Sequence, residues 1–155
     1  MDKLEFKVTQ ISFDDGCRSD DCVYDVISIF INGKNLLDMV KECELPFATA
    51  EGKKSLAGSY IGIVPKELYE DLSKNFTEWK VPIYGCTCGC VECWPLEVAI
   101  DIGKDVVVWY DFEQIHREAW QYNRLGSFVF NKQQYFEEVE KLKNYRDNLP
   151  LFSDL

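Results

Sequence analysis

The feature that most constrains this chain is a run of four cysteines within eight residues. These are Cys86, Cys88, Cys90 and Cys93, and they make up four of the seven cysteines in a chain of 155 residues. A thiol resembles other small apolar groups in shape and differs from them in its reactivity and metal affinity. The density of thiols therefore indicates a chemical site rather than a packing preference.

The spacing of the run predicts its place in the fold. A short strand is expected over residues 81–84, and residues two apart in an extended segment face the same side, so Cys86, Cys88 and Cys90 point together. Gly89 allows a tight turn that brings Cys93 round to them. Clustered thiolates suit tetrahedral zinc.

The compact C-x-C-x-C-x-x-C pattern differs from the usual zinc site, in which two C-x-x-C pairs are far apart in the sequence. A more distant residue is therefore an alternative for one ligand. Two other interpretations stay open, namely a loop of inert thiols packed under Trp94 and a redox or nucleophilic site.

His116 is the only histidine, so any imidazole ligand or base must be this residue. It is interpreted as a loop residue bonded to the backbone, as a zinc ligand beside three cysteines, or as the base of a Cys-His pair. The candidate metal ligands are therefore Cys86, Cys88, Cys90, Cys93 and His116.

Hydrophobic periodicity and turn residues predict an α+β fold, with a mainly antiparallel sheet of about five strands and about three helices. Strands are expected over 4–13, 23–31, 81–84, 96–102 and 106–110. Helices are expected over 35–43, over 66–75 after a first-turn proline at 65, and over 132–146 after an Asn131 cap, with a long loop over 44–60. The length suits a single domain over residues 1–155.

The chain is acidic, with 17 Lys and Arg against 27 Asp and Glu and a formal charge of -10. Such a charge repels phosphate backbones and anionic membranes, so we expect neither nucleic acid nor membrane as a partner. A basic protein is the partner that the charge favours, steered by the aspartate-rich hairpin at residues 14–25.

The N-terminal residues lack the apolar core of a signal peptide, and the chain has no apolar run near eighteen residues. We therefore expect a cytoplasmic protein. Reduced thiols or a metal site then suit seven cysteines better than a disulfide framework.

The C-terminal half contains the motifs Gly85-Cys86-x-Cys88-Gly89, Cys93-Trp94-Pro95-Leu96, Trp109-x-Asp111-Phe112-x-Gln114-x-His116-Arg117, Trp120-x-Tyr122, Gly126-x-Phe128-x-Phe130 and Gln134-Tyr135. Together these motifs resemble a family of small uncharacterised bacterial proteins. The resemblance implies a site of Cys86, Cys88, Cys93 and His116, with Cys90 as an additional thiol. The chain departs from the family pattern at Ile115, where the family usually has proline. The resemblance implies no particular activity.

The sequence thus favours a binding or interaction protein with a structural zinc site. The alternatives are a small thiol-dependent enzyme that uses a Cys-His pair and an acidic protein that masks a basic partner such as a toxin. A structural site should be buried and saturated by protein ligands, whereas an enzyme needs an open thiolate beside a cleft.

Overall fold

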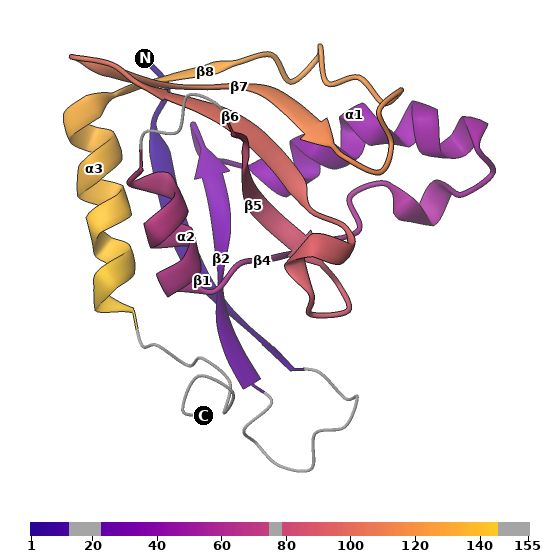
Figure 1. Cartoon of the computed structure of the whole chain (residues 1–155), viewed down its shortest axis with the longest axis horizontal. Helices are drawn as coiled ribbons and strands as arrows, with labels where there is room; N and C mark the ends of the chain where they lie inside the picture. The colour runs from indigo at the N-terminus through magenta and orange to yellow at the C-terminus, as the bar shows by residue number, and fades with distance from the viewer. Residues whose placement is uncertain (13–22, 75–78, 146–155) are drawn as a thin grey trace.

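A computed structural model describes residues 1–12, 23–74 and 79–145 of the chain. Within them, three helices accompany two antiparallel sheets, of strand order β1-β2-β3 and β4-β5-β6-β7-β8 (Figure 1). The predicted α+β class with three helices is confirmed, and the strands are divided between two sheets rather than gathered in one.

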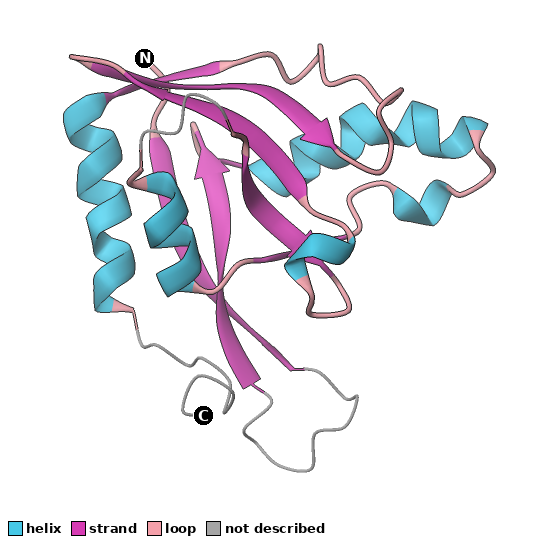
Figure 2. Ribbon diagram, in the orientation of Figure 1, coloured by secondary structure: helices cyan, strands magenta, loops and turns pink. Residues whose placement is uncertain are grey.

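Three strands come first, helices and strands then follow one another up to β5, and the described part of the chain ends on helical turns (Figure 2). The strands are β1 (Leu4–Ser12), β2 (Val23–Ile31), β3 (Lys34–Asn35), β4 (Tyr60–Gly62), β5 (Val81–Cys86), β6 (Leu96–Ile102), β7 (Val106–Gln114) and β8 (Phe128–Asn131). The helices are α1 (Leu36–Ala50), α2 (Pro65–Leu72) and α3 (Lys132–Glu140), with short 3-10 turns η2 (Lys54–Leu56), η3 (Val91–Cys93) and η4 (Lys141–Asn144).

The two sheets meet at two places, and both contacts are backbone hydrogen bonds. The Ile27 N–H in β2 donates to the Ile63 carbonyl at 2.9 Å, and the Asp2 N–H donates to the Val129 carbonyl in β8 at 2.8 Å. A Cβ atom at Gly62 would lie 2.3 Å from the Ile27 carbonyl oxygen, so only glycine permits this approach. The sheets consequently share one continuous apolar core.

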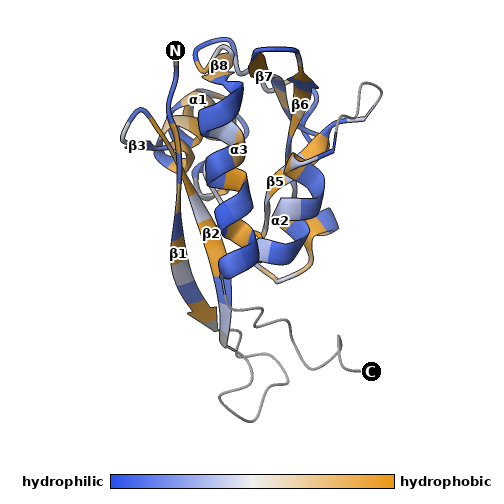
Figure 3. Cartoon of the chain, turned by 90° about the vertical axis from the view of Figure 1, so that its left-hand side faces the viewer, coloured by the Kyte–Doolittle hydropathy of each residue, from blue (hydrophilic) through white to orange (hydrophobic). Residues whose placement is uncertain are grey.

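Helix α3 covers the free edge of β1 with side chains instead of another strand. The Gln134 side chain accepts from the Leu4 N–H and donates to the Leu4 carbonyl, and Glu138 accepts from the Phe6 N–H at 3.1 Å. Unpaired strand edges promote aggregation unless they are covered, and this helix covers one. The surface that α3 turns away from the sheet is largely hydrophilic (Figure 3).

The predicted helix over 35–43 is longer than expected, and the predicted loop over 44–60 is wrong in its first part. Helix α1 continues to Ala50 with Pro46 inside it, although proline lacks the N–H that a helix interior uses. Pro46 is exposed, whereas Glu44 and Ala48 beside it are fully buried. The burial of this helix face outweighs the local cost of the proline.

Strand β7 also runs further than predicted, to Gln114 instead of residue 110. The register between β6 and β7 shifts between Glu97 and Ala99, and Asp111 opposite this shift has a positive φ of 56°. A bulge of this kind bends a strand without ending it. It carries the chain on to a buried Gln114 and from there to His116.

The remaining predicted elements are present, with small differences in their ends. The Asn131 cap is confirmed, because its side chain accepts from the Gln134 N–H at 3.0 Å. The three shortest strands, β3, β4 and β8, were not predicted, and the hairpin loop at residues 14–22 lies outside the described residues. None of the helices in the described residues has the length and apolar composition needed to span a bilayer.

Candidate thiol site

The four clustered cysteines run from Cys86, the last residue of β5, into the connection between β5 and β6; we call residues 86–93 the thiol loop (Figure 1). The loop begins with a turn in which the Gly89 N–H donates to the Cys86 carbonyl at 3.0 Å. Gly89 has a φ of 97°, which side chains other than glycine rarely adopt. The chain then forms η3, whose last residue is Cys93.

Close packing returns η3 to the strand from which the loop starts. A Cβ atom added to Gly85 would lie 3.1 Å from a methyl carbon of Val91 and 3.2 Å from its Cα. The glycine therefore lets the turn lie directly against β5. The predicted reversal at Gly89 is confirmed. The extended segment predicted to place Cys86, Cys88 and Cys90 on one side is wrong, because the chain already turns between Cys86 and Gly89.

Backbone amides support two of the sulfur atoms. The Cys88 N–H points to the Sγ of Cys86 at 3.5 Å, and the Cys90 N–H points to the Sγ of Cys88 at 3.4 Å. The amide of Cys90, followed by the Cys86 thiol, lowers the pKa of Cys88 below its ordinary value. An N–H donor favours the charged form of the group to which it points, so Cys88 is the thiol best prepared to act as a thiolate.

Cys93 shows the opposite effect. Hydrogen bonding to the thiols of Cys88 and Cys90, together with their charge, raises the pKa of Cys93 to about 12. Burial raises the pKa of Cys86, and the Cys88 thiol adds to this effect. The four thiols thus affect one another's pKa as a connected series, in the order Cys86, Cys88, Cys93, Cys90.

The thiol loop is open to solvent. Cys88, Cys90 and Cys93 are exposed and Cys86 is half-buried, whereas Cys43 in α1 is buried in the core. Cys17 and Cys22 lie outside the described residues. A buried, protein-saturated site of the predicted structural kind does not match this exposure.

His116 reaches the thiol loop through a backbone atom. Its ring Nε2 lies 3.4 Å from the carbonyl oxygen of Glu92, the middle residue of η3. Because a carbonyl can only accept, Nε2 must carry the proton in this contact. The ring stacks on Trp94 with centroids 6.0 Å apart and 13° between the planes. His116 therefore holds η3 in place from outside the cluster of sulfur atoms.

The residues that follow His116 in the sequence tie its segment to the C-terminal end of helix α1. Arg117 lies over the Trp94 ring at 5.2 Å and forms an ion pair with Glu51 at 2.9 Å. The Trp120 indole N–H donates to the other oxygen of the Glu51 carboxylate at 2.6 Å. One carboxylate at the C-terminal end of α1 thus anchors the segment that carries His116.

A buried polar cluster that was not predicted packs against this segment. The Glu44 carboxylate is fully buried and accepts hydrogen bonds from Tyr60 and Tyr122, both at 2.5 Å, and from the Gly58 N–H at 2.8 Å. The Gln114 side chain donates to the Tyr60 hydroxyl at 3.1 Å and accepts from the His116 N–H at 3.1 Å. We call these five residues (Glu44, Gly58, Tyr60, Gln114, Tyr122) the Glu44 network.

Burial dominates the titration of the Glu44 network. It raises the pKa of Glu44, while the bonds from Tyr122, Tyr60 and Gly58 act in the opposite direction. Burial also raises the pKa values of Tyr60 and Tyr122, and the charge of the neighbouring Glu44 carboxylate raises them further. The one signal in the sequence is that Glu44 falls among the apolar residues of a helical face, where an unpaired carboxylate is costly.

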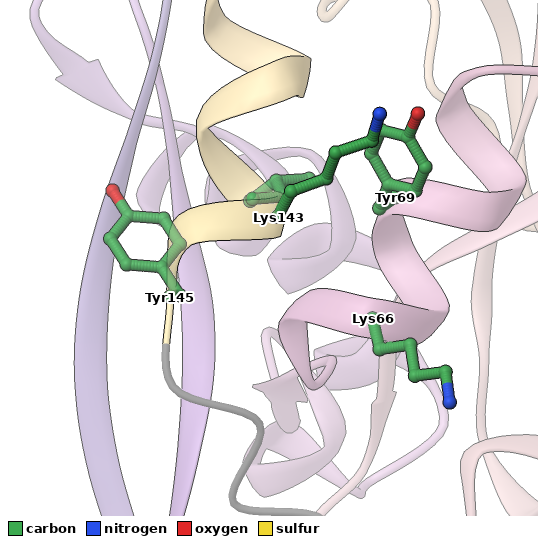
Figure 4. A pocket seen from close by; sticks show the side chains of 5 residues that line it. Lys66, Tyr69, Lys143 and Tyr145 are labelled. Atoms are coloured by element: carbon green, nitrogen blue, oxygen red, sulfur yellow. The ribbon is translucent and has the colours of Figure 1, made fainter.

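A shallow pocket of about 230 Å³ lies between α2 and η4, away from the thiol loop (Figure 4). Its lining residues are Lys66, Tyr69, Leu142, Lys143 and Tyr145. Lys143 forms an ion pair with Glu140 at 3.0 Å, and Tyr69 donates to the same carboxylate at 3.3 Å. Two of the polar groups that line this pocket are thus engaged by Glu140.

In residues 1–12, 23–74 and 79–145, no three His, Cys, Asp or Glu side chains are placed so that they could hold a metal ion as they stand. Metal binding at the thiol loop would therefore require its sulfur atoms to move closer together. Comparisons with protein-family models, curated proteins and solved structures found no match.

Proposed function

We propose that the chain is a binding protein whose thiol loop takes up one zinc ion in the reduced state. The observation that carries the proposal is the connected series of four thiols, of which two receive backbone N–H groups at their sulfur atoms. Zinc binds thiolates, and N–H donors stabilise thiolates before the metal arrives. The ligands we assign are Cys86, Cys88, Cys90 and Cys93.

Zinc uptake at this loop includes a local closure. Four sulfur atoms at about 2.3 Å from one ion must lie nearer to each other than free thiols do. The loop is exposed and begins at a glycine turn, so its side chains have room to rotate inward. The binding free energy then orders the loop, as it does in sites that form only with their metal.

His116 supports the site without binding the ion. Its Nε2 is engaged by the Glu92 carbonyl, and its backbone N–H is held by Gln114. Fixing Glu92 also fixes Cys93, the next residue along the chain. Groups that orient metal ligands from behind typically change metal affinity by 10- to 100-fold when removed.

The test is a zinc titration of the reduced protein, followed by elemental analysis. Wild type should bind one zinc per chain, and serine substitution at each of the four loop cysteines should weaken binding at least tenfold. Cys43→Ala is the matched control, because it removes one thiol that is buried in the core on helix α1 and does not belong to the loop. It should bind zinc like the wild type.

Two outcomes would overturn the zinc proposal. One is a reduced wild-type protein that binds no zinc when the ion is in excess. The other is a variant with serine at all four loop positions that binds zinc as tightly as wild type does.

A second candidate function is the binding of a basic protein at an acidic strip on the larger sheet. The strip consists of Glu97, Asp111 and Glu113 around Lys80, with Trp79 beside it at 71% exposure. Glu97 and Glu113 are direct cross-strand partners, and like charges in such positions repel. Burial and the Glu113 charge raise the pKa of Glu97, and a cationic partner would relieve both effects.

This second candidate is tested with a lysine-rich peptide as the probe. Binding should weaken when salt screens the charges and when Glu97 and Glu113 are both replaced by glutamine. An affinity that ignores salt and the double substitution would remove the acidic strip from consideration.

A further inference from the structure

The arrangement of the loop thiols distinguishes one pair from the others. Cys93 is the last residue of η3, which packs back against the beginning of the loop. Cys88 is an exposed thiol whose sulfur receives a backbone N–H, that of Cys90 at 3.4 Å. An N–H donor stabilises a thiolate, so Cys88 is suited to attack a disulfide, and the exposed Cys93 is suited to close the bond.

The backbone closes the loop that carries these two thiols without help from a metal. The Gly89 turn closes the first half of the loop, and the contact of Val91 with Gly85 closes the second half. His116 adds its contact with the Glu92 carbonyl. Two thiols that a fold brings together in solvent are suited to form a disulfide.

We propose that Cys88 and Cys93 form a reversible disulfide by exchange with a small-molecule disulfide, and that this bond and the bound zinc exclude each other. The exclusion rests on the proposed function, because both sulfur atoms are assigned there as zinc ligands. The formation of the disulfide does not depend on the metal.

The exchange consists of two steps. The Cys88 sulfur attacks one sulfur of the small disulfide, forms a mixed disulfide and releases one small thiol. The Cys93 sulfur then attacks the Cys88 sulfur and releases the second small thiol. The protein loses two electrons and two protons, and the small disulfide gains them as two thiols.

Zinc controls this exchange because a thiolate bound to the ion has its electron pair committed to the metal. The zinc-bound loop should therefore resist oxidation, and the oxidised loop should lack two of its four ligands. The thiol loop would in this way combine metal binding with a response to the thiol–disulfide balance around it.

The experiment equilibrates the reduced, zinc-free protein with oxidised glutathione, blocks the remaining thiols and digests with a protease that cleaves after glutamate. Cleavage after Glu92 places Cys93 on one peptide and Cys86, Cys88 and Cys90 on another, so an internal disulfide to Cys93 joins the two. We expect this linkage in wild type and in Cys90→Ser. Cys93→Ser should stop at the mixed disulfide with glutathione, and Cys88→Ser should not form the linkage.

Two results would overturn the disulfide proposal. One is a Cys88→Ser variant that joins the two peptides as completely as wild type does. The other is a wild-type protein that accumulates only mixed disulfides. The peptides that contain Cys17, Cys22 and Cys43 are followed separately, so their oxidation does not enter the result.

A second arm separates this proposal from the proposed function. Zinc-loaded protein is treated with oxidised glutathione while a chelating dye reports released zinc, and release should match the formation of the Cys88–Cys93 bond. A protein that forms this bond and never binds zinc would refute the metal site alone. A protein that binds zinc and forms no such bond would refute the disulfide alone.

Discussion

The Glu44 network and the thiol loop are both clusters of polar, titratable side chains, and they differ in what satisfies them. The Glu44 carboxylate is fully buried and receives three hydrogen bonds, two from the segment of Gly58 and Tyr60 and one from Tyr122. The loop thiols are mostly exposed and interact chiefly with one another. A buried cluster whose bonds are complete stabilises a fold, whereas an exposed cluster of thiols retains capacity for a ligand.

The two regions are also connected. Gln114 donates to Tyr60 in the Glu44 network and accepts from the backbone of His116, whose ring bonds to the thiol loop. The buried Glu44 network therefore positions His116, and His116 in turn supports the exposed thiol loop. The predictions that follow test this division of roles, from the largest expected effect to the smallest.

The largest effect should come from Glu44→Ala. The substitution leaves two buried hydroxyl groups and one amide without their acceptor, and each such loss costs about 1–3 kcal/mol. We expect the free energy of unfolding in urea to fall by about 3 kcal/mol or more. Glu42→Ala is the matched control, because Glu42 lies in the same helix and is exposed. Equal stability of the two variants would contradict the structural role of the Glu44 network.

Zinc should stabilise the protein through the thiol loop. Free zinc at 100 times its dissociation constant adds about 2.7 kcal/mol to the free energy of unfolding of a protein that binds it only when folded. Urea unfolding with and without zinc should show this gain in wild type and in Cys43→Ala. A variant with serine at all four loop positions should show no gain and, without zinc, should be nearly as stable as wild type.

The raised pKa of Glu44 predicts a pH dependence of stability. A carboxyl group whose pKa is higher in the folded protein binds its proton more tightly there, so its contribution is greatest below the ordinary value near 4.5 and falls as the pH rises through the folded value. Glu44→Gln cannot titrate. The difference in unfolding free energy between wild type and Glu44→Gln should therefore shift against wild type as the pH increases above 4.5, and a constant difference would contradict the assignment.

The smallest effect on stability is expected for His116→Ala, because His116 is exposed and contacts the loop at a single carbonyl. The free energy of unfolding should change by about 0.5 kcal/mol or less. Zinc affinity should nevertheless fall by about tenfold, since the support of η3 is lost. An unchanged zinc affinity would show that His116 does not support the site. Complete loss of zinc binding would show that His116 is itself a ligand.

Local patterns predicted much of the fold. Alternating residues located β1, a run rich in Val, Ile and Phe located β2, and a hairpin turn at Gly103 located β6. The Asn131 cap located α3, and Gly89 among the cysteines located the turn of the thiol loop. The Glu44 network could not be predicted in this way, because Glu44 and Tyr122 are 78 positions apart and only the folded chain brings them together. The same applies to the path of α1 through Pro46, where long-range burial outweighs a local rule. His116 was predicted as a candidate, and only the structure places its Nε2 at the Glu92 carbonyl.

X-ray absorption at the zinc edge of the zinc-loaded, reduced protein tests the central claim most directly, because it reports the ligand atoms themselves. Four thiolates from the loop predict a single shell of four sulfur atoms at about 2.3 Å. A shell of three sulfur atoms and one nitrogen at about 2.0 Å would identify His116 as the fourth ligand and would contradict its role as a support. A shell of oxygen and nitrogen atoms alone would contradict the assignment of the thiol loop as the binding site.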